Sequence, residues 1–276
     1  MLAGMTDAIR LVNGVEMPRL GLGTYKSAEG GDVEGAVTAA LEIGYRRIDT
    51  ASFYGNESGV GSAIAAGRVP RTEIFLASKV WNDEQGYDHT LAAFERTLTR
   101  LGTDYLDLYL VHWPRSDTPE TWRAMERLYA EGAVRAIGVC NHLEAQLEAL
   151  MATAGIAPMV DQYEYHPWLQ QPALRAFCQR HGIIVEAWAP LMRGRVSGVP
   201  ELLEIGERHG KSPAQVAIRW LLQHDVATIP KSVHRDRIVE NADVFDFTLT
   251  SLEMETIDAL DRGERLGPDL RSFGDA

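Results

Sequence analysis

Four side chains that are able to give or take protons lie at or just beyond the ends of successive apolar segments: Asp49, Tyr54, Lys79 and His112. An acid followed in a polar loop by a tyrosine is more typical of a site than of a core. Each residue alone has a simpler explanation: Asp49 as a cap of backbone amides, Lys79 as a surface lysine, His112 as a core histidine. Whether they form a site therefore depends on the elements that position them.

Short apolar runs rich in β-branched or aromatic residues alternate with longer segments of helical period. The predicted strands are 20–24, 46–49, 74–79, 105–112, 133–140, 159–163, 183–188 and 227–230. The predicted helices are 32–43, 56–66, 87–101, 119–130, 143–154, 171–181, 201–209, 213–224, 235–243 and 252–260. Asn13-Gly14 predicts a two-residue hairpin turn before the first strand, and Asn56 is a candidate N-cap of the second helix.

Strands and helices in this order indicate an α/β fold, either a (β/α)8 barrel or a doubly wound sheet. The doubly wound sheet needs a glycine-rich first turn for a dinucleotide, and Gly21-Leu22-Gly23 lacks the third glycine. We therefore predict a (β/α)8 TIM barrel preceded by an N-terminal β-hairpin, as one domain over residues 1–276. In such barrels the active site lies at the C-terminal ends of the strands. Those ends are polar and aromatic here, whereas the strand interiors read as apolar.

The amino-acid composition excludes several classes of binding partner. The net charge of −12, with no basic run to offset it, argues against nucleic acid and anionic membranes. No segment approaches the ~18–20 apolar residues of a membrane span, and residues 1–10 lack a signal-peptide core. Cys140 and Cys178 have no metal-binding spacing and are expected to be free thiols in a reducing compartment. We expect a cytoplasmic monomer whose partner is a small molecule.

Six motifs carry a resemblance to a known family. They are GYRRIDTASFYGNE at 44–57, ASKVW at 77–81, LYLVHWP at 108–114, GVCNH at 138–142, QYEYHP at 162–167 and IPKSVHRDRIVEN at 229–241. From the hairpin to nearly the last residues the chain resembles the aldo-keto reductase family, nearest to bacterial 2,5-diketo-D-gluconate reductase-type members. The resemblance implies NADPH-dependent reduction of aldehydes or ketones, such as dicarbonyls, keto-sugars or small aldehydes.

The resemblance also implies a catalytic tetrad of Asp49, Tyr54, Lys79 and His112. Reducing a carbonyl with hydride creates an alkoxide, which needs a proton donor. Tyr54 is the expected general acid, and a neighbouring Lys79 ammonium is expected to lower the pKa of Tyr54 from about 10. Asp49 would keep Lys79 charged and oriented, and His112 would orient the substrate carbonyl.

The cofactor site is predicted partly from position. Lys231-Ser232 follow the last strand and lead into a helix, a recurrent phosphate position in barrels, where the two cations Lys231 and Arg237 suit a 2′-phosphate. Asn141 and Gln162 would hold the nicotinamide amide, although Cys140 and Ala189 depart from the family pattern. The predicted cofactor contacts are Gly23, Thr24, Asp49, Cys140, Asn141, Gln162, Trp188, Leu191, Lys231, Ser232, Val233, His234, Arg237, Glu240 and Asn241.

Substrate contacts are expected from residues at the mouth of the barrel, which are Tyr25, Phe53, Trp81, His112 and Trp113. The segment 191–200 reads as a mobile loop that closes over the cofactor, and the tail after Asp261 is expected to cover the rim. Three arginines near these segments could favour an anionic substrate, which are Arg193, Arg195 and Arg271.

Other functions remain open on the same residues. His112, His142 and His166 end three strands and suggest a metal-dependent hydrolase, although the ligand set is incomplete, so no metal is predicted. Lys79 could form a Schiff base, as in barrel aldolases. Outside enzymes, the scaffold could serve as a cofactor-binding redox sensor or regulatory subunit.

Overall fold

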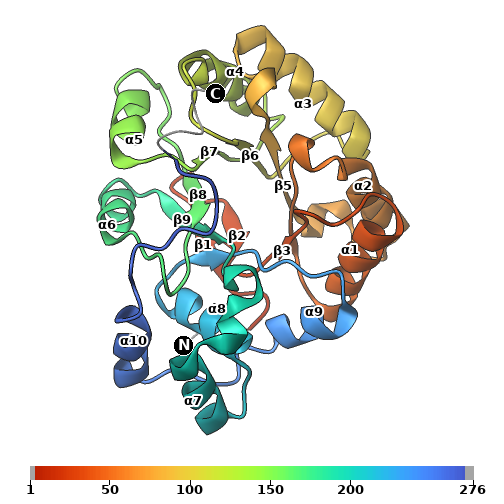
Figure 1. Ribbon diagram of the computed structural model, residues 1–276. Helices are drawn as coiled ribbons and strands as arrows, with labels where there is room; N and C mark the ends of the chain where they lie inside the picture. Colours follow the sequence, from red (N-terminus) through yellow and green to blue (C-terminus); the bar gives the residue numbers. More distant parts are fainter. Residues whose placement is uncertain (1–3, 271–276) are drawn as a thin grey trace.

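The computed structural model describes residues 4–270, and eight parallel strands form its centre (Figure 1). Each strand pairs with its neighbours along the chain, and bridges from Leu20 to Thr228 and from Gly23 to Lys231 join the first strand to the last. The strands are β3 (Leu22–Gly23), β4 (Arg47–Asp49), β5 (Phe75–Val80), β6 (Leu108–Val111), β7 (Ile137–Cys140), β8 (Val160–Glu164), β9 (Ile184–Trp188) and β10 (Ala227–Thr228). The sheet is therefore a closed barrel, as the sequence predicted.

Helices surround this barrel and cover its outer face (Figure 1). They are α1 (Gly31–Ile43), α2 (Glu57–Ala66), α3 (Tyr87–Leu101), α4 (Thr118–Ala130), α5 (Glu144–Met151), α6 (Pro172–Arg180), α7 (Pro200–His209), α8 (Pro213–Gln223), α9 (Arg235–Ala242) and α10 (Ser251–Asp258). Short 3-10 turns add η1 (Ser52–Tyr54), η2 (Arg71–Glu73), η3 (Asn82–Glu84) and η4 (Met192–Gly198). The order confirms a (β/α)8 fold in which short loops bring the strand ends together.

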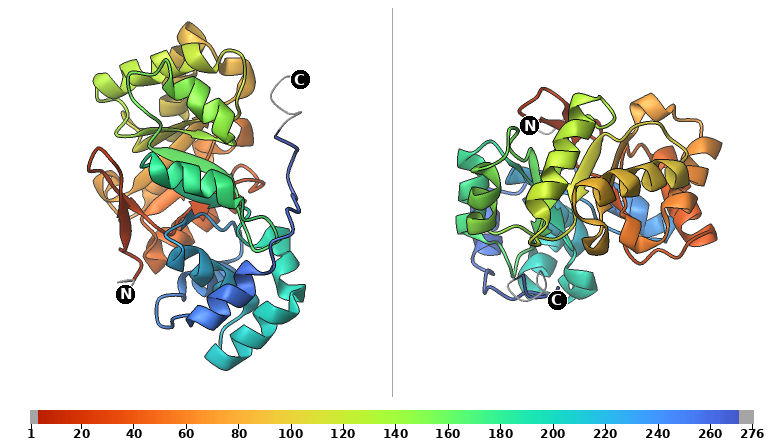
Figure 2. Two further views of the ribbon diagram at one scale, coloured as in Figure 1. Left: turned by 90° about the vertical axis from the view of Figure 1, so that its left-hand side faces the viewer. Right: turned by 90° about the horizontal axis from the view of Figure 1, so that it is seen from above.

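The N-terminal hairpin pairs β1 (Ala8–Arg10) with β2 (Glu16–Pro18), as predicted. Its turn has three residues rather than two, because the Leu11 amide donates to the Val15 carbonyl and Gly14 takes a positive φ of 87°. The buried side chains of Leu11 and Met17 belong to the core. Figure 2 (left) shows this hairpin and the C-terminal tail at opposite ends of the barrel.

Two predicted strands are too long at their N-terminal ends. The segments 105–112 and 133–140 are strands only as β6 and β7, with a single bridge from Leu106 to Val134 before them. The interruption is polar: Asp107 accepts hydrogen bonds of 2.8 Å from both Arg71 and Arg135. An apolar-run pattern cannot anticipate this break, because both arginines come from other units.

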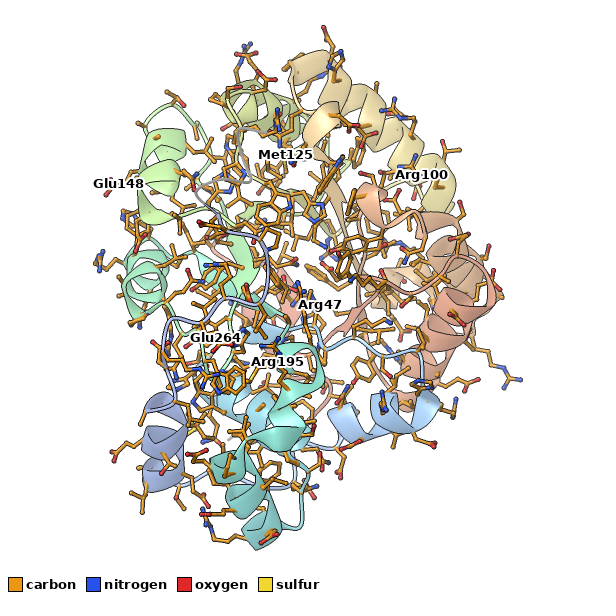
Figure 3. All side chains as sticks on the ribbon, viewed as in Figure 1. Arg47, Arg100, Met125, Glu148, Arg195 and Glu264 are labelled. Atoms are coloured by element: carbon orange, nitrogen blue, oxygen red, sulfur yellow. The ribbon has the colours of Figure 1, made fainter. Side chains whose placement is uncertain are left out.

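The barrel interior is not wholly apolar, which corrects the sequence-based expectation. Arg47 in β4 forms an ion pair with Glu186 in β9, and both side chains are fully buried. Arg47 and Asp49 lie two residues apart on one strand, so both point to the same side, the inside of the barrel. A Cβ on Gly21 would lie 2.9 Å from Cγ of Arg47, so glycine makes room for this side chain. Figure 3 places Arg47 near the centre of the molecule.

Candidate active site

Three of the four predicted catalytic side chains are in direct contact at the C-terminal ends of β4 and β5. The Nζ atom of Lys79 lies 2.5 Å from Oδ1 of Asp49 and 3.3 Å from the hydroxyl oxygen of Tyr54. It also donates to the Thr50 carbonyl at 2.8 Å. All three hydrogens of the ammonium therefore have acceptors, so Lys79 is fixed as well as charged.

His112 follows β6 and completes the group. Its ring centroid lies 5.7 Å from that of Tyr54 and 4.9 Å from that of Trp81, in edge-to-face arrangements. The backbone carbonyl of His112 accepts a hydrogen bond of 3.0 Å from Nδ2 of Asn141. The imidazole is 8% exposed, so it borders the mouth while being held by its neighbours.

Electrostatics assign a protonation state to each group. Burial lowers the pKa of Lys79, but the attraction of Asp49 and Tyr54 outweighs it, so the pKa is raised and the amine stays charged. Burial lowers the pKa of His112 well below its usual value, helped by the Lys79 charge, so the imidazole is neutral at pH 7.

Tyr54 departs from expectation. Burial raises the pKa of its hydroxyl, and the opposing influence of Lys79, although it lowers the pKa as predicted, does not compensate. The net direction is upward instead of downward. Sequence reasoning weighed the ammonium and overlooked desolvation. The phenol is therefore fully protonated at neutral pH.

The loop that carries Tyr54 is held by Asn56. This residue occupies the N-cap position of α2, as predicted, but its side chain makes no capping hydrogen bond. Its Nδ2 donates to the carbonyls of Thr24 and Ser27, and its Oδ1 accepts from Thr50. Asn56 therefore fastens the β3 and β4 loops together.

Ser52 holds the same loop to the end of β5, a role the sequence analysis missed. Its Oγ donates to the Lys79 carbonyl at 3.2 Å, and it lies 2.9 Å from Oε2 of Glu84. Because η1 begins at Ser52, these contacts fix the position of Tyr54 relative to Lys79. The sequence offered only a strand-end serine as a signal.

The residues predicted to hold the nicotinamide form a hydrogen-bonded polar chain, in which the Asn141 backbone amide donates to the Gln162 carbonyl at 3.0 Å. Gln162 donates to Oδ2 of Asp49 at 2.9 Å, and Nε1 of Trp188 donates to Oδ1 of Asn141 at 2.9 Å. Asn141 takes a φ of 62°, which turns the chain at the end of β7. Each amide keeps hydrogen-bonding capacity beyond these contacts, since each has two donors and a two-lone-pair oxygen. The donor set therefore fits a carboxamide beside a half-buried indole.

Three further predicted cofactor contacts have structural roles next to these hydrogen-bonded residues: Gly23, Thr24 and Cys140. A Cβ on Gly23 would lie 2.7 Å from the Ile229 carbonyl oxygen, so glycine permits the close approach that closes the barrel. The buried Thr24 hydroxyl donates to the Asp49 carbonyl at 3.0 Å. The Cys140 thiol is buried, which raises its pKa well above the ordinary value, so it is not a thiolate.

The predicted phosphate site lies at the start of α9. Nζ of Lys231 donates to the Lys26 carbonyl at 3.1 Å, and Oγ of Ser232 accepts from the His234 amide at 3.0 Å. Val233 is partly buried between them. Arg237 and Glu240 lie on the α9 face as predicted, with Arg237 exposed, whereas Asn241 is buried. Exposed cations next to a helix start suit a phosphate group.

Comparison with known proteins decides the family. Residues 19–262 match the family model described as the aldo/keto reductase family. The chain belongs to this family. The chain is 53% identical over 269 residues to the glyoxal reductase of Bacillus subtilis (strain 168), covering 97% of this chain and 98% of that protein. The predicted family and enzyme class, an oxidoreductase, are confirmed.

Solved aldo-keto reductases have the same fold. An enzyme from a Medee basin deep-sea metagenome library superposes with a TM-score of 0.94 at 45% identity, covering 95% of this chain and 98% of that one. The aldo-keto reductase of Bombyx mori, solved in complex with NADP, gives a TM-score of 0.91 at 34% identity, covering 99% of each chain.

Aromatic side chains line the mouth of this aldo-keto reductase. Phe53 stacks on Trp81 with ring centroids 3.7 Å apart, and the Tyr25 ring lies 5.0 Å from that of Tyr54. Phe53 and Tyr25 are 50% and 44% exposed, unusual for large apolar rings. Trp113 is more buried than expected, at 6%, and its carbonyl accepts from Gln85.

The segment 191–200, predicted as a mobile loop, contains regular structure. It forms the 3-10 turn η4, in which Met192 and Val196 are buried in the core, while the partly buried Leu191 packs against it. Arg195 pairs with Glu264 at 3.3 Å (Figure 3), a carboxylate that Arg262 also contacts at 2.7 Å, so its charge is partly balanced. Arg193 is exposed. Arg271 lies outside the described residues. Support for an anionic substrate is therefore weaker than predicted.

The other predicted chemistries find little support. His142 contacts the Cys140 carbonyl and His166 contacts Glu164, so the three histidines do not converge. Between residues 4 and 270, no cluster of three metal-ligating side chains occurs. A charged Lys79 is a poor nucleophile for a Schiff base. Within the same range no helix has the length and apolar character to span a membrane.

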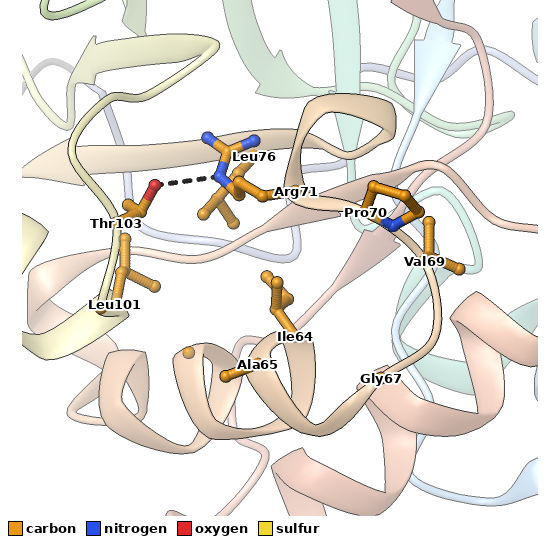
Figure 4. Close-up of a pocket in the computed structure, with 11 residues that line it drawn as sticks. Ile64, Ala65, Gly67, Val69, Pro70, Arg71, Leu76, Leu101 and Thr103 are labelled. Atoms are coloured by element: carbon orange, nitrogen blue, oxygen red, sulfur yellow. Dashed lines mark hydrogen bonds between the residues drawn. The ribbon is translucent and has the colours of Figure 1, made fainter.

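A separate cavity of about 280 Å³ lies between α2, α3 and the start of β5 (Figure 4). Leu76, near the N-terminal end of β5, places it at the opposite end of the barrel from Lys79. Its polar residue Arg71 already donates to Thr103 at 3.0 Å and to Asp107 at 2.8 Å. The N-terminal face of such a barrel serves stability rather than catalysis, so we assign this cavity no function.

Proposed function

We propose that this protein reduces small aldehydes, ketones and dicarbonyls to alcohols with NADPH, with Tyr54 as the general acid. The observation that carries the proposal is the buried Lys79 ammonium in contact with Asp49 and Tyr54, at 2.5 and 3.3 Å. A lysine held this way stabilises a phenolate that forms when Tyr54 gives up its proton.

The chain's own groups move the proton. The Tyr54 hydroxyl is protonated at neutral pH, so the proton is available when the substrate oxygen becomes an alkoxide, a far stronger base than a phenolate. Nδ1 of His112 has no hydrogen-bond partner and is buried, which favours placing the imidazole proton on Nε2. The neutral imidazole then donates to the carbonyl oxygen and orients it. Asp49 and Gln162 keep Lys79 in place.

NADPH supplies the hydride in this proposal. Asn141 and Gln162 would hold its carboxamide, and the Trp188 indole would lie against its ring. Lys231 and Arg237 favour a 2′-phosphate, and so NADPH over NADH. The NADP complex of the Bombyx mori relative supports this choice.

Small dicarbonyls are the proposed substrates. The glyoxal reductase relative supports this class, and the exposed Phe53–Trp81 stack offers a flat apolar wall beside His112. We also propose that residues 1–276 act as one domain, as a monomer in the cytoplasm. The net charge of −12 agrees with a protein that avoids nucleic acid and anionic membranes.

Following NADPH absorbance with glyoxal, methylglyoxal, keto-sugars and simple aldehydes tests the proposal. We expect oxidation with at least one dicarbonyl, and with NADH only at higher cofactor concentration. Tyr54→Phe should lower kcat by roughly 10²–10⁴-fold while NADPH affinity is kept.

Tyr129→Phe is the matched control, because its hydroxyl accepts a hydrogen bond from Asn13 in the N-terminal hairpin turn, away from the tetrad. It should turn over like the wild type. The assignment of Tyr54 is wrong if Tyr54→Phe and Tyr129→Phe have equal kcat. The proposed function fails if the wild type oxidises NADPH with none of these carbonyls.

A further inference from the structure

The C-terminal tail lies against the carboxyl ends of β8 and β9, next to the proposed nicotinamide site (Figure 1, dark blue). Residues 265–267 of the tail contact Glu164, the last residue of β8. The Glu164 side chain is fully buried. A carboxylate this deeply buried is costly unless it is hydrogen-bonded.

The tail supplies most of the hydrogen bonds to Glu164. The amides of Leu266 and Gly267 donate to Oε1 at 2.7 and 3.2 Å, and the Gly267 amide also reaches Oε2 at 3.0 Å. Arg265 approaches Oε2 at 3.3 Å, and Nε2 of His166 lies 3.0 Å from Oε1. These contacts lower the pKa of Glu164 although burial by itself raises it, so the group is ionised.

The tail is also tied to the segment that follows β8. Arg265 donates to Oε1 of Gln171 at 3.2 Å, and Gln171 donates to the Glu164 carbonyl at 2.8 Å. Upstream, the Glu264 amide donates to the Trp168 carbonyl at 2.9 Å. The tail is therefore held at several points between Glu264 and Gly267.

The contacts between Glu164 and residues 265–267 are called the clamp below. Gly267 connects the clamp to the proposed nicotinamide site. A Cβ at Gly267 would lie 2.4 Å from Cη2 and 3.2 Å from Cζ3 of Trp188. Gly267 has no positive φ, so space and not backbone conformation explains the glycine. The tail backbone therefore contacts one end of the Trp188 indole. At the other end, Nε1 donates to Asn141, and Asn141 in turn donates to the His112 carbonyl.

We propose that Glu164 is a positioning residue for hydride transfer: by clamping residues 265–267, it fixes the plane of the Trp188 indole against which the nicotinamide ring lies. Glu164 acts through Gly267 and Trp188 and touches neither substrate nor cofactor. The inference rests on the proposed function, because it assigns Trp188 to the nicotinamide ring.

Replacing Glu164 by glutamine tests the clamp at nearly constant size. The Gln NH2 group would face backbone amides that are also donors, so one side of the clamp is lost. We expect the Leu266 and Gly267 amides to lose protection from hydrogen exchange. We expect kcat to fall about 10- to 100-fold with every carbonyl substrate, since small misplacements of reacting groups have effects of this size.

Gly267→Ala tests the other end of the same contact and keeps the carboxylate. The added methyl would lie 2.4 Å from the indole and 3.0 Å from Oε2 of Glu164, so the tail, the indole or the carboxylate must move. The value of kcat should therefore fall in the same range. With NADPH deuterated at the transferred position, both variants should show a larger isotope effect on kcat than the wild type, because hydride transfer becomes slower. A purely structural role would leave that isotope effect unchanged.

Two controls match these changes. Glu148→Gln removes an exposed carboxylate on α5 (Figure 3), and Gly35→Ala adds a methyl to α1 where no atom lies within 4 Å. Both should behave like the wild type. Unchanged kcat and isotope effect in Gly267→Ala, or retained amide protection in Glu164→Gln, would overturn the proposal, as would a loss confined to KM for bulky carbonyls.

Failure of the proposed function gives a different result. If wild-type protein oxidised no NADPH, the exchange measurement would still report on the clamp, since it needs no turnover. If wild-type turnover were normal and the Tyr54→Phe variant inactive while both clamp variants were fully active, the function would stand and the clamp would fall.

Discussion

At the scale of single residues, desolvation and partner geometry set the chemistry of this site. Lys79 is charged because Asp49 lies 2.5 Å away, and His112 is neutral because it is buried near that charge. Burial also keeps Tyr54 neutral, which for a phenol means protonated, whereas for the His112 imidazole the neutral form is the deprotonated one. Desolvation disfavours the charged form of each group, and only Lys79 has a partner close enough to resist it.

Asp161 is a second buried group whose pKa is shifted mainly by desolvation. It is fully buried on β8, and neither carboxyl oxygen accepts a hydrogen bond of good geometry, although the His142 backbone approaches and partly opposes the effect of burial. Burial raises its pKa well above the usual value near 3.8. A carboxyl whose pKa is raised on folding stabilises the protein fully below the unfolded pKa, and that contribution is lost as pH rises through the folded pKa.

We therefore predict that Asp161→Asn stabilises the protein at pH 7.5. The free energy of unfolding should rise by on the order of 1–3 kcal/mol, the cost of an unsatisfied buried polar group. Urea unfolding at pH 5 and pH 7.5 should show a smaller pH-dependent loss in the variant than in the wild type. Asp104→Asn, at an exposed loop position, is the control. A variant less stable than wild type at pH 7.5 would contradict the prediction.

Sequence alone predicted candidate reacting residues but not those that hold them. The tetrad followed from motifs, since Asp49 and Tyr54 lie within one continuous stretch. The contacts of Ser52 with Glu84, and of Asn56 with Thr24, join residues 32 positions apart. Such pairs depend on how two β/α units meet, which no local pattern records.

At the scale of elements, the positions of the helices were predicted better than their caps. The helix expected at 252–260 is α10 (Ser251–Asp258), and Thr250 caps it. Thr250 and Glu253 form a reciprocal capping box, with contacts of 3.3 and 2.9 Å. The T-x-x-E spacing was a signal in the sequence that the apolar periodicity did not use.

Glu253 also joins α10 to α7, because it contacts Arg208 at 3.2 Å and His209 at 3.0 Å. Burial raises the pKa of Glu253, but hydrogen bonds from Thr250 and His209 outweigh it and lower the pKa to about 2. A depressed carboxyl pKa contributes stability above the unfolded value, near 4.3, that is lost as pH falls toward the folded value.

We predict that Glu253→Gln lowers the free energy of unfolding at pH 7 by about 0.5–2 kcal/mol, the range of helix-cap effects. The difference from wild type should be constant above about pH 5 and shrink as pH falls further. Glu255→Gln, on the exposed face of the same helix, should change little. A pH-independent difference would mean that charge is not what Glu253 contributes.

At the scale of the whole molecule, the strands form a closed barrel, and its interior contains the buried ion pair between Arg47 and Glu186. The closed order was predictable from eight alternating units, because parallel strands with short connections have few arrangements. The Arg47–Glu186 pair was not, because its partners come from β4 and β9, on well-separated parts of the chain. An arginine inside the sequence RRIDT reads as a strand-edge residue until the barrel closes.

This pair gives a prediction about the whole fold. Glu186→Gln leaves the Arg47 charge uncompensated and should destabilise the protein by roughly 3–5 kcal/mol. Replacing both residues, as Arg47→Met with Glu186→Leu, should recover most of that loss, since apolar side chains of similar volume avoid the desolvation penalty.

Unfolding in urea at pH 7 measures both variants and the Arg47→Met single variant in a double-mutant cycle. If the double variant is as unstable as the sum of the single variants, the two residues do not act as a pair.

The hairpin and the tail lie at opposite ends of the barrel (Figure 2). An enzyme immobilised on a solid support or joined to a second protein has one end turned toward its attachment. Attachment through the first residues would turn the mouth outward to the bulk solution. Attachment through the last residues would pull on the tail segment that contacts Trp188. The end chosen for tethering would therefore affect activity.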